Sequence, residues 1–142
     1  MYQRILLPID LNTESSWVKA LPSAVALCRS FGATLQLMTV VPDFGMSMVA
    51  QYFPAGTEER MKADAAAALR QFAEANVPAD VRVRDIVAEG NVYREILRVA
   101  GEEEADLIIM GSHRPEVSDF LLGANAARVV RHADCSVMVV RG

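Results

Sequence analysis

The chain has 142 residues, of which 52% are hydrophobic and 23% charged, and its formal net charge is −4 at pH 7. This length predicts one domain over residues 1–142, and the apolar content excludes a disordered chain. The negative charge gives no field that would hold a nucleic acid, and no apolar stretch reaches the length of a membrane span. We therefore expect neither nucleic acid nor membrane as a partner.

Two cysteines, Cys28 and Cys135, are too few for a disulfide framework, and we expect both to pack in the core. Residues 1–8 lack the charged start and the small-residue cleavage site of a signal peptide. We therefore expect the protein in the cytoplasm.

Five short runs rich in Val, Ile and Leu predict strands. These runs are Arg4–Asp10, Ala33–Val41, Val81–Glu89, Asp106–Gly111 and Cys135–Arg141. The first, fourth and fifth runs are almost continuously apolar, which is typical of strands covered on both faces. The third run carries several charges, which indicates an edge strand.

Apolar residues at three- and four-residue steps predict a helix between successive strands. The first helix ends at Phe31, and Pro22 predicts either a kink or a start later than Ser16. Thr57 is predicted to cap the second helix, and Asn91 the third. The predicted helices run to Phe31, from Thr57 to Ala75, from Val92 to about Glu103, and from Ala124 to His132.

This alternation predicts an α/β fold with a single open, doubly wound, five-stranded parallel sheet, for which we expect the strand order 3-2-1-4-5. Ligands of such sheets bind beyond the carboxyl ends of the strands, at a point where successive connections leave in opposite directions. The candidate positions are therefore Asp10, Val41 and Gly111. On spacing alone, Asp10 is equally compatible with a ligand contact and with a turn or cap carboxylate.

The segment from Met110 to Ala126 is the richest in polar chemistry. Gly111 lets the backbone leave a buried strand tightly, and Gly123 opens a helix whose first amides lack partners. Free amides at a helix start bind anions, and Arg114 can add a forked contact to phosphate oxygens. The pattern favours a phosphate site. The alternative is a glycine-shaped loop with a solvated arginine.

The opening ILLPID, the strand ATLQLMTVV and the segment ADLIIMGSHRPEVSDFLLGANAARVVRHADCSVMVVRG resemble the universal stress protein family over essentially the whole chain. Nucleotide-binding members carry Gly, two residues, Gly, nine residues, then Gly followed by Ser or Thr. Here Gly111 matches, Arg114 stands at the second glycine, and Ala124 replaces the hydroxyl residue. The SHRP…LLG…NA pattern resembles a bacterial branch of small, single-domain members that is also associated with ATP.

The resemblance implies a Rossmann-like fold with ATP bound at the carboxyl edge of the sheet. Asp10 would lie beside the base, with Pro8 and Ile9 shaping that wall. The backbone of Val40 and Val41 would read the adenine edge.

The phosphate side is implied in the same way. Gly111, just after Met110, would lie against the ribose and the first phosphate. The start of the last helix would donate amides to the outer phosphates, with the Asn125 side chain a candidate substitute for the missing hydroxyl. The implied phosphate-side residues are Met110, Gly111, Ser112, His113, Arg114, Gly123, Ala124 and Asn125.

The strand Cys135–Arg141 would form an edge whose apolar residues carry no charge to block pairing. Antiparallel pairing of this strand across a two-fold axis would satisfy its free backbone groups, and members of the family dimerise in this way. We therefore expect a homodimer. The alternative is an edge covered by the terminal residues.

The leading interpretation is an ATP-binding, homodimeric stress-response protein that regulates an unknown protein partner. Any Mg²⁺ would arrive with the phosphates, because His113 and His132 show no metal-site spacing, and we assign no catalytic residue. The alternatives are a weak ATPase or autophosphorylating phosphotransferase, a nucleotide-free interaction module, and a flavodoxin-like redox protein. The long apolar connection Pro42–Gly56 is expected to dock on the domain or to act as a lid.

Overall fold

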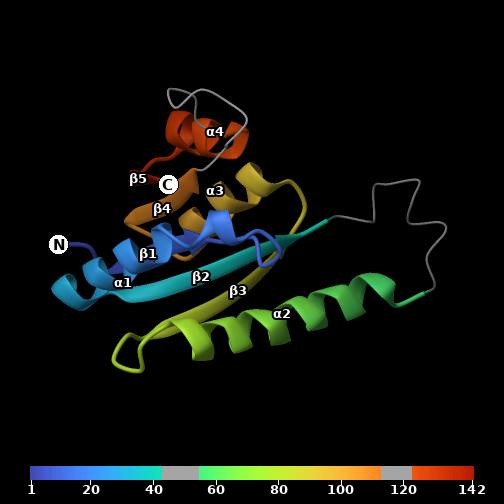
Figure 1. The fold of residues 1–142 in the computed structure, drawn as a ribbon. Helices are drawn as coiled ribbons and strands as arrows, with labels where there is room; N and C mark the ends of the chain where they lie inside the picture. The colour runs from blue at the N-terminus through green and yellow to red at the C-terminus, as the bar shows by residue number, and fades with distance from the viewer. Residues whose placement is uncertain (43–54, 113–122) are drawn as a thin grey trace.

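A five-stranded sheet forms the centre of the molecule (Figure 1). The computed structural model describes residues 1–42, 55–112 and 123–142. The strands are β1 (Arg4–Pro8), β2 (Thr34–Val41), β3 (Val83–Glu89), β4 (Leu107–Ser112) and β5 (Ser136–Arg141). All of them pair in parallel, in the order β3-β2-β1-β4-β5. The predicted fold class and strand order are confirmed. The connection at 43–54 lies outside the described residues.

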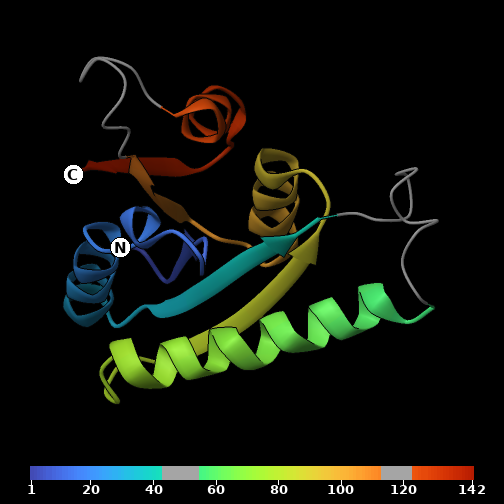
Figure 2. The ribbon, with the colours of Figure 1, turned by 45° about the vertical axis from the view of Figure 1, so that its right-hand side comes forward.

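Helices cover both faces of this sheet (Figure 2). They are α1 (Ala20–Phe31), α2 (Thr57–Asn76), α3 (Val92–Glu102) and α4 (Ala124–His132), with a 3-10 turn η1 (Glu14–Ser16) before α1. Side chains of α1 and α2 pack in one buried cluster, and those of α3 and α4 pack in a second cluster on the opposite face. The sheet is therefore doubly wound, as predicted.

The strand β1 separates the two clusters. Ile5 and Leu7 lie in the cluster beneath α1 and α2, whereas Leu6 lies in the cluster beneath α3 and α4. All three are fully buried, and the burial of each contributes roughly 1.5–3 kcal/mol. Cys28 of α1 packs in the first cluster, where burial raises the pKa of its thiol to about 11 and so keeps it uncharged.

The helix α1 begins later than Ser16, which is one of the two outcomes that Pro22 predicts. Pro22 is the third residue of α1, so its missing N–H falls in the first turn, where no intrahelical acceptor exists. The chain before it forms η1 instead of helix. At the other end Gly32, with φ of 67°, donates its amide to the Cys28 carbonyl and closes the helix.

The two predicted helix caps have different outcomes. Asn91 caps α3 as predicted, because its side chain accepts a hydrogen bond from the Arg94 amide at 3.4 Å. The cap predicted at Thr57 is wrong. Gly56 occupies that position with φ of 86°, and Thr57 is the first residue of α2.

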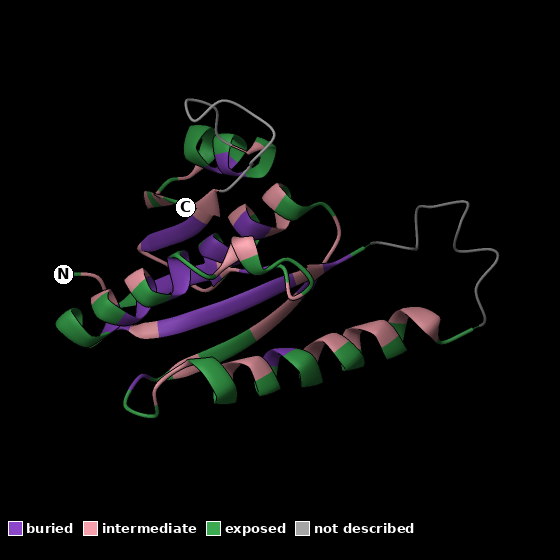
Figure 3. Ribbon diagram, in the orientation of Figure 1, coloured by how far each residue is buried: buried purple, intermediate pink, exposed green. Residues whose placement is uncertain are grey.

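The helix α2 is the longest helix described and the least buried (Figure 3). Leu69 is its one buried residue. An ion pair between Lys62 Nζ and Glu89 Oε2, at 2.8 Å, joins α2 to the end of β3. Within the described residues, no helix is both long and apolar enough to cross a membrane.

The prediction that the fifth strand is covered on both faces is wrong. All of β5 is described, and its residues are exposed or half-buried. This strand is the last in the sheet order, so only one of its sides has a neighbouring strand. The apolar residues of β5 therefore lie on an edge strand that the rest of the described chain covers only in part.

The acidic turn after α3 is held by hydrogen bonds to neighbouring strands. Glu103 accepts two hydrogen bonds from the Arg84 guanidinium, both at 2.9 Å, and its carbonyl accepts one from the buried Gln36 amide. Glu104 has φ of 54°, which is unfavourable for a residue with a Cβ. Backbone hydrogen bonds hold this turn: the Glu104 amide donates to the Gly101 carbonyl at 3.3 Å and the Ala105 amide to the Ala100 carbonyl at 2.9 Å, which is the pattern of a helix end closed by a left-handed residue.

We expect Glu104→Gly to stabilise the protein by about 0.5–1 kcal/mol, because glycine adopts a positive φ without steric cost. Chemical denaturation measures the change in the free energy of unfolding. Gly32→Ala is the matched control, since it places a Cβ at φ of 67° with nothing within 4 Å of it and should destabilise the protein by about 1 kcal/mol. A Glu104→Gly variant less stable than the parent would contradict this account.

Candidate functional site

The chain turns sharply after β1 around the Asp10 side chain. Asp10 Oδ1 accepts a hydrogen bond from the Asn12 amide at 3.0 Å, and Oδ2 accepts one from Thr13 Oγ1 at 2.9 Å. The Ser16 hydroxyl accepts from the Asp10 amide at 2.9 Å and donates to the Thr13 carbonyl at 2.7 Å. Because of this turn, β1 ends at Pro8 and not at Asp10 as predicted. Asp10 is therefore a turn carboxylate, which agrees with one of its two interpretations, and its contact with a ligand stays a prediction.

Gly111 lies where β4 passes against the η1 turn. A Cβ at this position would lie 2.6 Å from the Ser16 carbonyl oxygen and 3.3 Å from that of Ser15. Only glycine allows the strand and the turn to approach so closely. Gly111 thus has a packing role that its place in the sequence motif did not reveal.

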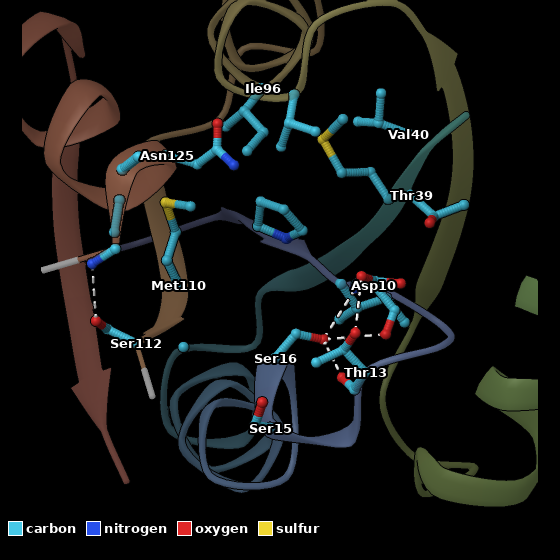
Figure 4. A pocket seen from close by; sticks show the side chains of 18 residues that line it. Asp10, Thr13, Ser15, Ser16, Thr39, Val40, Ile96, Met110, Ser112 and Asn125 are labelled. Atoms are coloured by element: carbon cyan, nitrogen blue, oxygen red, sulfur yellow. Dashed lines mark hydrogen bonds between the residues drawn. The ribbon is translucent and has the colours of Figure 1, made fainter. Parts of the chain in front are cut away.

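A cavity of about 390 Å³ lies beyond the carboxyl ends of β1, β2 and β4 (Figure 4). β1 pairs with β2 on one side and with β4 on the other, so the cavity lies where the connections leave in opposite directions. Its volume falls within the range of about 300–1,000 Å³ that is usual for small-molecule sites.

Most of the site residues predicted from the sequence line this cavity. The lining includes Pro8, Ile9, Asp10, Val40, Met110, Gly111, Ser112, Gly123, Ala124 and Asn125. Residues from three separate parts of the chain are therefore brought together. Their role in binding remains a prediction.

Three predicted site residues are not placed at the cavity. Val41 is absent from the described lining, whereas Met38, Thr39 and Val40 of the same strand line the cavity. The Val41 carbonyl also accepts a hydrogen bond from the Gly90 amide at 3.0 Å. His113 and Arg114 lie outside the described residues.

Sequence reasoning missed much of the wall. The additional lining residues are Thr13, Ser15, Ser16, Met38, Thr39, Val92, Ile96 and Ala126. Ser15 and Ser16 lie just before α1, in the 3-10 turn η1. The sequence offered one signal for this part of the wall, which is the group of hydroxyl residues between β1 and α1.

The cavity has two chemically different sides (Figure 4). Hydroxyls of Thr13, Ser15 and Ser16 line the side formed by the η1 turn, whereas Val40 and Ile96 belong to an apolar side between β2 and α3. An apolar slot beside hydrogen-bonding groups suits a flat, partly polar ring system.

The third part of the wall is the start of α4. Ser112 Oγ accepts a hydrogen bond from the Gly123 amide at 3.4 Å, which joins the end of β4 to the residue before this helix. The amides of Ala124, Asn125 and Ala126 are in the first turn and have no acceptor within the helix. The Asn125 side chain points toward the cavity (Figure 4). This end of the cavity can therefore donate hydrogen bonds to an anion.

The family assignment agrees with this arrangement. The model of the universal stress protein family matches residues 1–141. The chain belongs to the universal stress protein family. The resemblance that the sequence showed is thereby confirmed, and the protein is a stress-response protein of that family.

Individual universal stress proteins are similar to this chain along their whole length. Universal stress protein G from Escherichia coli O157:H7 is 32% identical over 144 residues, which cover 99% of this chain and 100% of that protein. UspA from Lactobacillus plantarum has a TM-score of 0.76 and 27% identity, covering 99% of this chain and 98% of its own. A family member from Arabidopsis thaliana with AMP bound has the same fold, with a TM-score of 0.65, 15% identity, and coverage of 98% and 91%.

We expect Gly111→Ala to destabilise this universal stress protein by about 1–3 kcal/mol, because the new methyl group would overlap the Ser16 carbonyl oxygen. Thermal or chemical denaturation measures the loss. Gly101→Ala is the matched control: a Cβ at Gly101 of α3 has nothing within 4 Å, so the change should be neutral or stabilising. Equal effects of the two substitutions would show that the close approach of η1 and β4 is unimportant.

Proposed function

We propose that this universal stress protein binds ATP in the cavity beyond β1 and β4, and that nucleotide occupancy regulates its contacts with a protein partner. The observation that carries the proposal is the junction of an apolar slot with the unpaired amides of α4 in one cavity. The AMP-bound family member from Arabidopsis thaliana supports an adenine nucleotide as the ligand. Residues 1–142 would form the single domain that binds the nucleotide.

The apolar side of the cavity suits the base of a nucleotide, and the start of α4 suits its phosphates. The base would lie near Pro8, Ile9 and Val40, where apolar surface is exposed to the cavity. The phosphates would lie between Gly111 and the start of α4, where backbone amides donate hydrogen bonds. Mg²⁺ would come with the phosphates, since the described residues hold no group of three or more metal-ligating side chains.

The residue after the last glycine of the family motif is Ala124, which offers no hydroxyl. Ser112 supplies a hydroxyl next to the start of α4, because its Oγ is 3.4 Å from the Gly123 amide. The Asn125 side chain adds a second polar group on the cavity wall. These two side chains make up for the absence of the usual hydroxyl in the proposed phosphate site.

We expect purified protein to release stoichiometric adenine nucleotide on denaturation, or to gain thermal stability with added ATP. Ala124→Asp should lower ATP affinity at least about tenfold, because the carboxylate would repel phosphate while favouring the helix start. Ala127→Asp carries the same charge on an exposed position of α4 outside the described cavity wall and should bind nearly as the parent does.

Two outcomes would overturn the proposal. No released nucleotide and no thermal shift with ATP would favour a nucleotide-free interaction module. Product formed from excess ATP beyond one equivalent per chain would favour the weak ATPase or phosphotransferase.

We also propose that the protein is a homodimer paired through β5. In the described chain β5 has a neighbouring strand only on the β4 side, and Met138 on this edge is 37% exposed. Antiparallel addition of a second β5 would satisfy the open backbone groups and cover this apolar surface.

We expect sedimentation analysis to show a dimer that Met138→Lys shifts toward monomer, because the new charges would face each other across the two-fold axis. Ala67→Lys adds the same charge on the exposed surface of α2 and should leave the dimer intact. A Met138→Lys protein that remains fully dimeric would exclude this interface.

A further inference from the structure

Two arginines share one tyrosine ring between α3 and α4. The Arg94 Nε donates a hydrogen bond to the Tyr93 hydroxyl at 3.1 Å, and the Arg94 Cζ lies 5.7 Å from the centroid of the same ring. The Arg128 Cζ, from α4, lies 5.0 Å from that centroid. The hydrogen bond from Arg94, together with the positive charges of both arginines, lowers the pKa of the Tyr93 phenol. Tyr93 thus holds two guanidinium groups close together.

Among the described residues, this arginine pair, Arg94 and Arg128, forms no ion pair with a carboxylate, in contrast to three other arginines. Arg29, Arg84 and Arg98 each form an ion pair with Asp or Glu at 2.7–2.9 Å. Among the described residues, no carboxylate forms such a pair with Arg94 or Arg128. Two guanidinium groups on one ring, with no described carboxylate paired to either, make a locally positive surface in a chain whose net charge is −4.

The position of Arg94 adds to this imbalance. It is the third residue of α3, in the first turn, where the helix dipole supplies positive potential; the acidic residue of this turn, Glu95, pairs with Arg98. A cation there is disfavoured in the free protein, and a bound anion would remove the penalty. In α4 the first turn contains no acidic residue that would offset the charge of Arg128.

The arginine pair lies on the two helices that line one side of the cavity, although neither arginine is itself a lining residue. Val92, which precedes Tyr93, lines the cavity from α3, and Asn125, one turn before Arg128, lines it from α4. Both helices begin at the carboxyl edge of the sheet, where the cavity opens (Figure 1). A chain of phosphates that passes the start of α4 would therefore be directed toward the α3–α4 rim.

We propose that Arg94 and Arg128 form a phosphate subsite at this rim, which takes the outer phosphates of a nucleoside triphosphate and favours it over the monophosphate. The inference rests on the proposed nucleotide function of the cavity. Guanidinium groups bind phosphate oxygens through paired N–H donors, and two of them can hold one phosphate or two neighbouring phosphates. Tyr93 is a positioning residue, since its ring and hydroxyl orient the pair and leave outward-facing donors for the ligand.

The test compares the affinities of AMP and ATP by isothermal titration calorimetry. The double variant Arg94→Gln with Arg128→Gln should bind ATP about tenfold or more weakly, because two charge-assisted contacts are lost, and should bind AMP within about twofold of the parent. Arg131→Gln is the matched control, because it removes the same charge from the last turn of α4, away from the cavity. It should leave both affinities nearly unchanged.

The Tyr93 variants separate positioning from folding. Tyr93→Phe keeps the ring and should retain most of the preference for ATP, whereas Tyr93→Leu removes the platform and should reduce the ratio of ATP to AMP affinity without abolishing AMP binding. Circular dichroism checks that both variants are folded.

The possible failures are distinguishable. If the parent protein binds neither AMP nor ATP, the proposed function of the cavity is wrong and the subsite falls with it. If the parent binds both nucleotides, but the double variant weakens them equally or not at all, the cavity function stands and the arginine subsite is overturned.

Discussion

The central position of β1 is the constraint on which the rest of the structure depends. Its side chains alternate between two buried clusters, and it pairs with β2 on one side and with β4 on the other. After β1 the chain therefore builds β2 and β3 on one side of this strand. It then crosses to the other side of β1 and builds β4 and β5 there. Both sets of connections diverge at the carboxyl end of β1, and the cavity opens at that point.

The turn after β1 makes this opening a shaped site. Asp10, Thr13 and Ser16 hold the η1 turn through their mutual hydrogen bonds, and Gly111 lets that turn approach β4 closely. The hydroxyl side of the cavity is consequently built by groups that also stabilise the fold. Because packing and ligand contact use the same residues here, a substitution at this turn would disturb both.

Sequence reasoning predicted the sheet, its order and most helices because hydrophobic periodicity is a local signal. It predicted Gly111, Gly123 and Asn125 at one site because the topology of a parallel sheet brings strand ends and helix starts together. It missed Thr39 and Ile96, which reach the cavity only because of long-range packing. It placed β5 correctly at an edge but overestimated the cover on this strand, because an apolar run looks the same in a covered strand and in a partly exposed one.

The shallow attachment of α2 has a consequence for how the molecule fluctuates. A helix of 20 residues that buries a single side chain has little to hold it against the sheet compared with the strands beneath it. Its backbone should open to solvent in excursions that leave β1 and β4 intact. Amide hydrogen exchange would then divide the protein into an early-opening outer layer and a slow inner layer, with the cavity bordering the slow one.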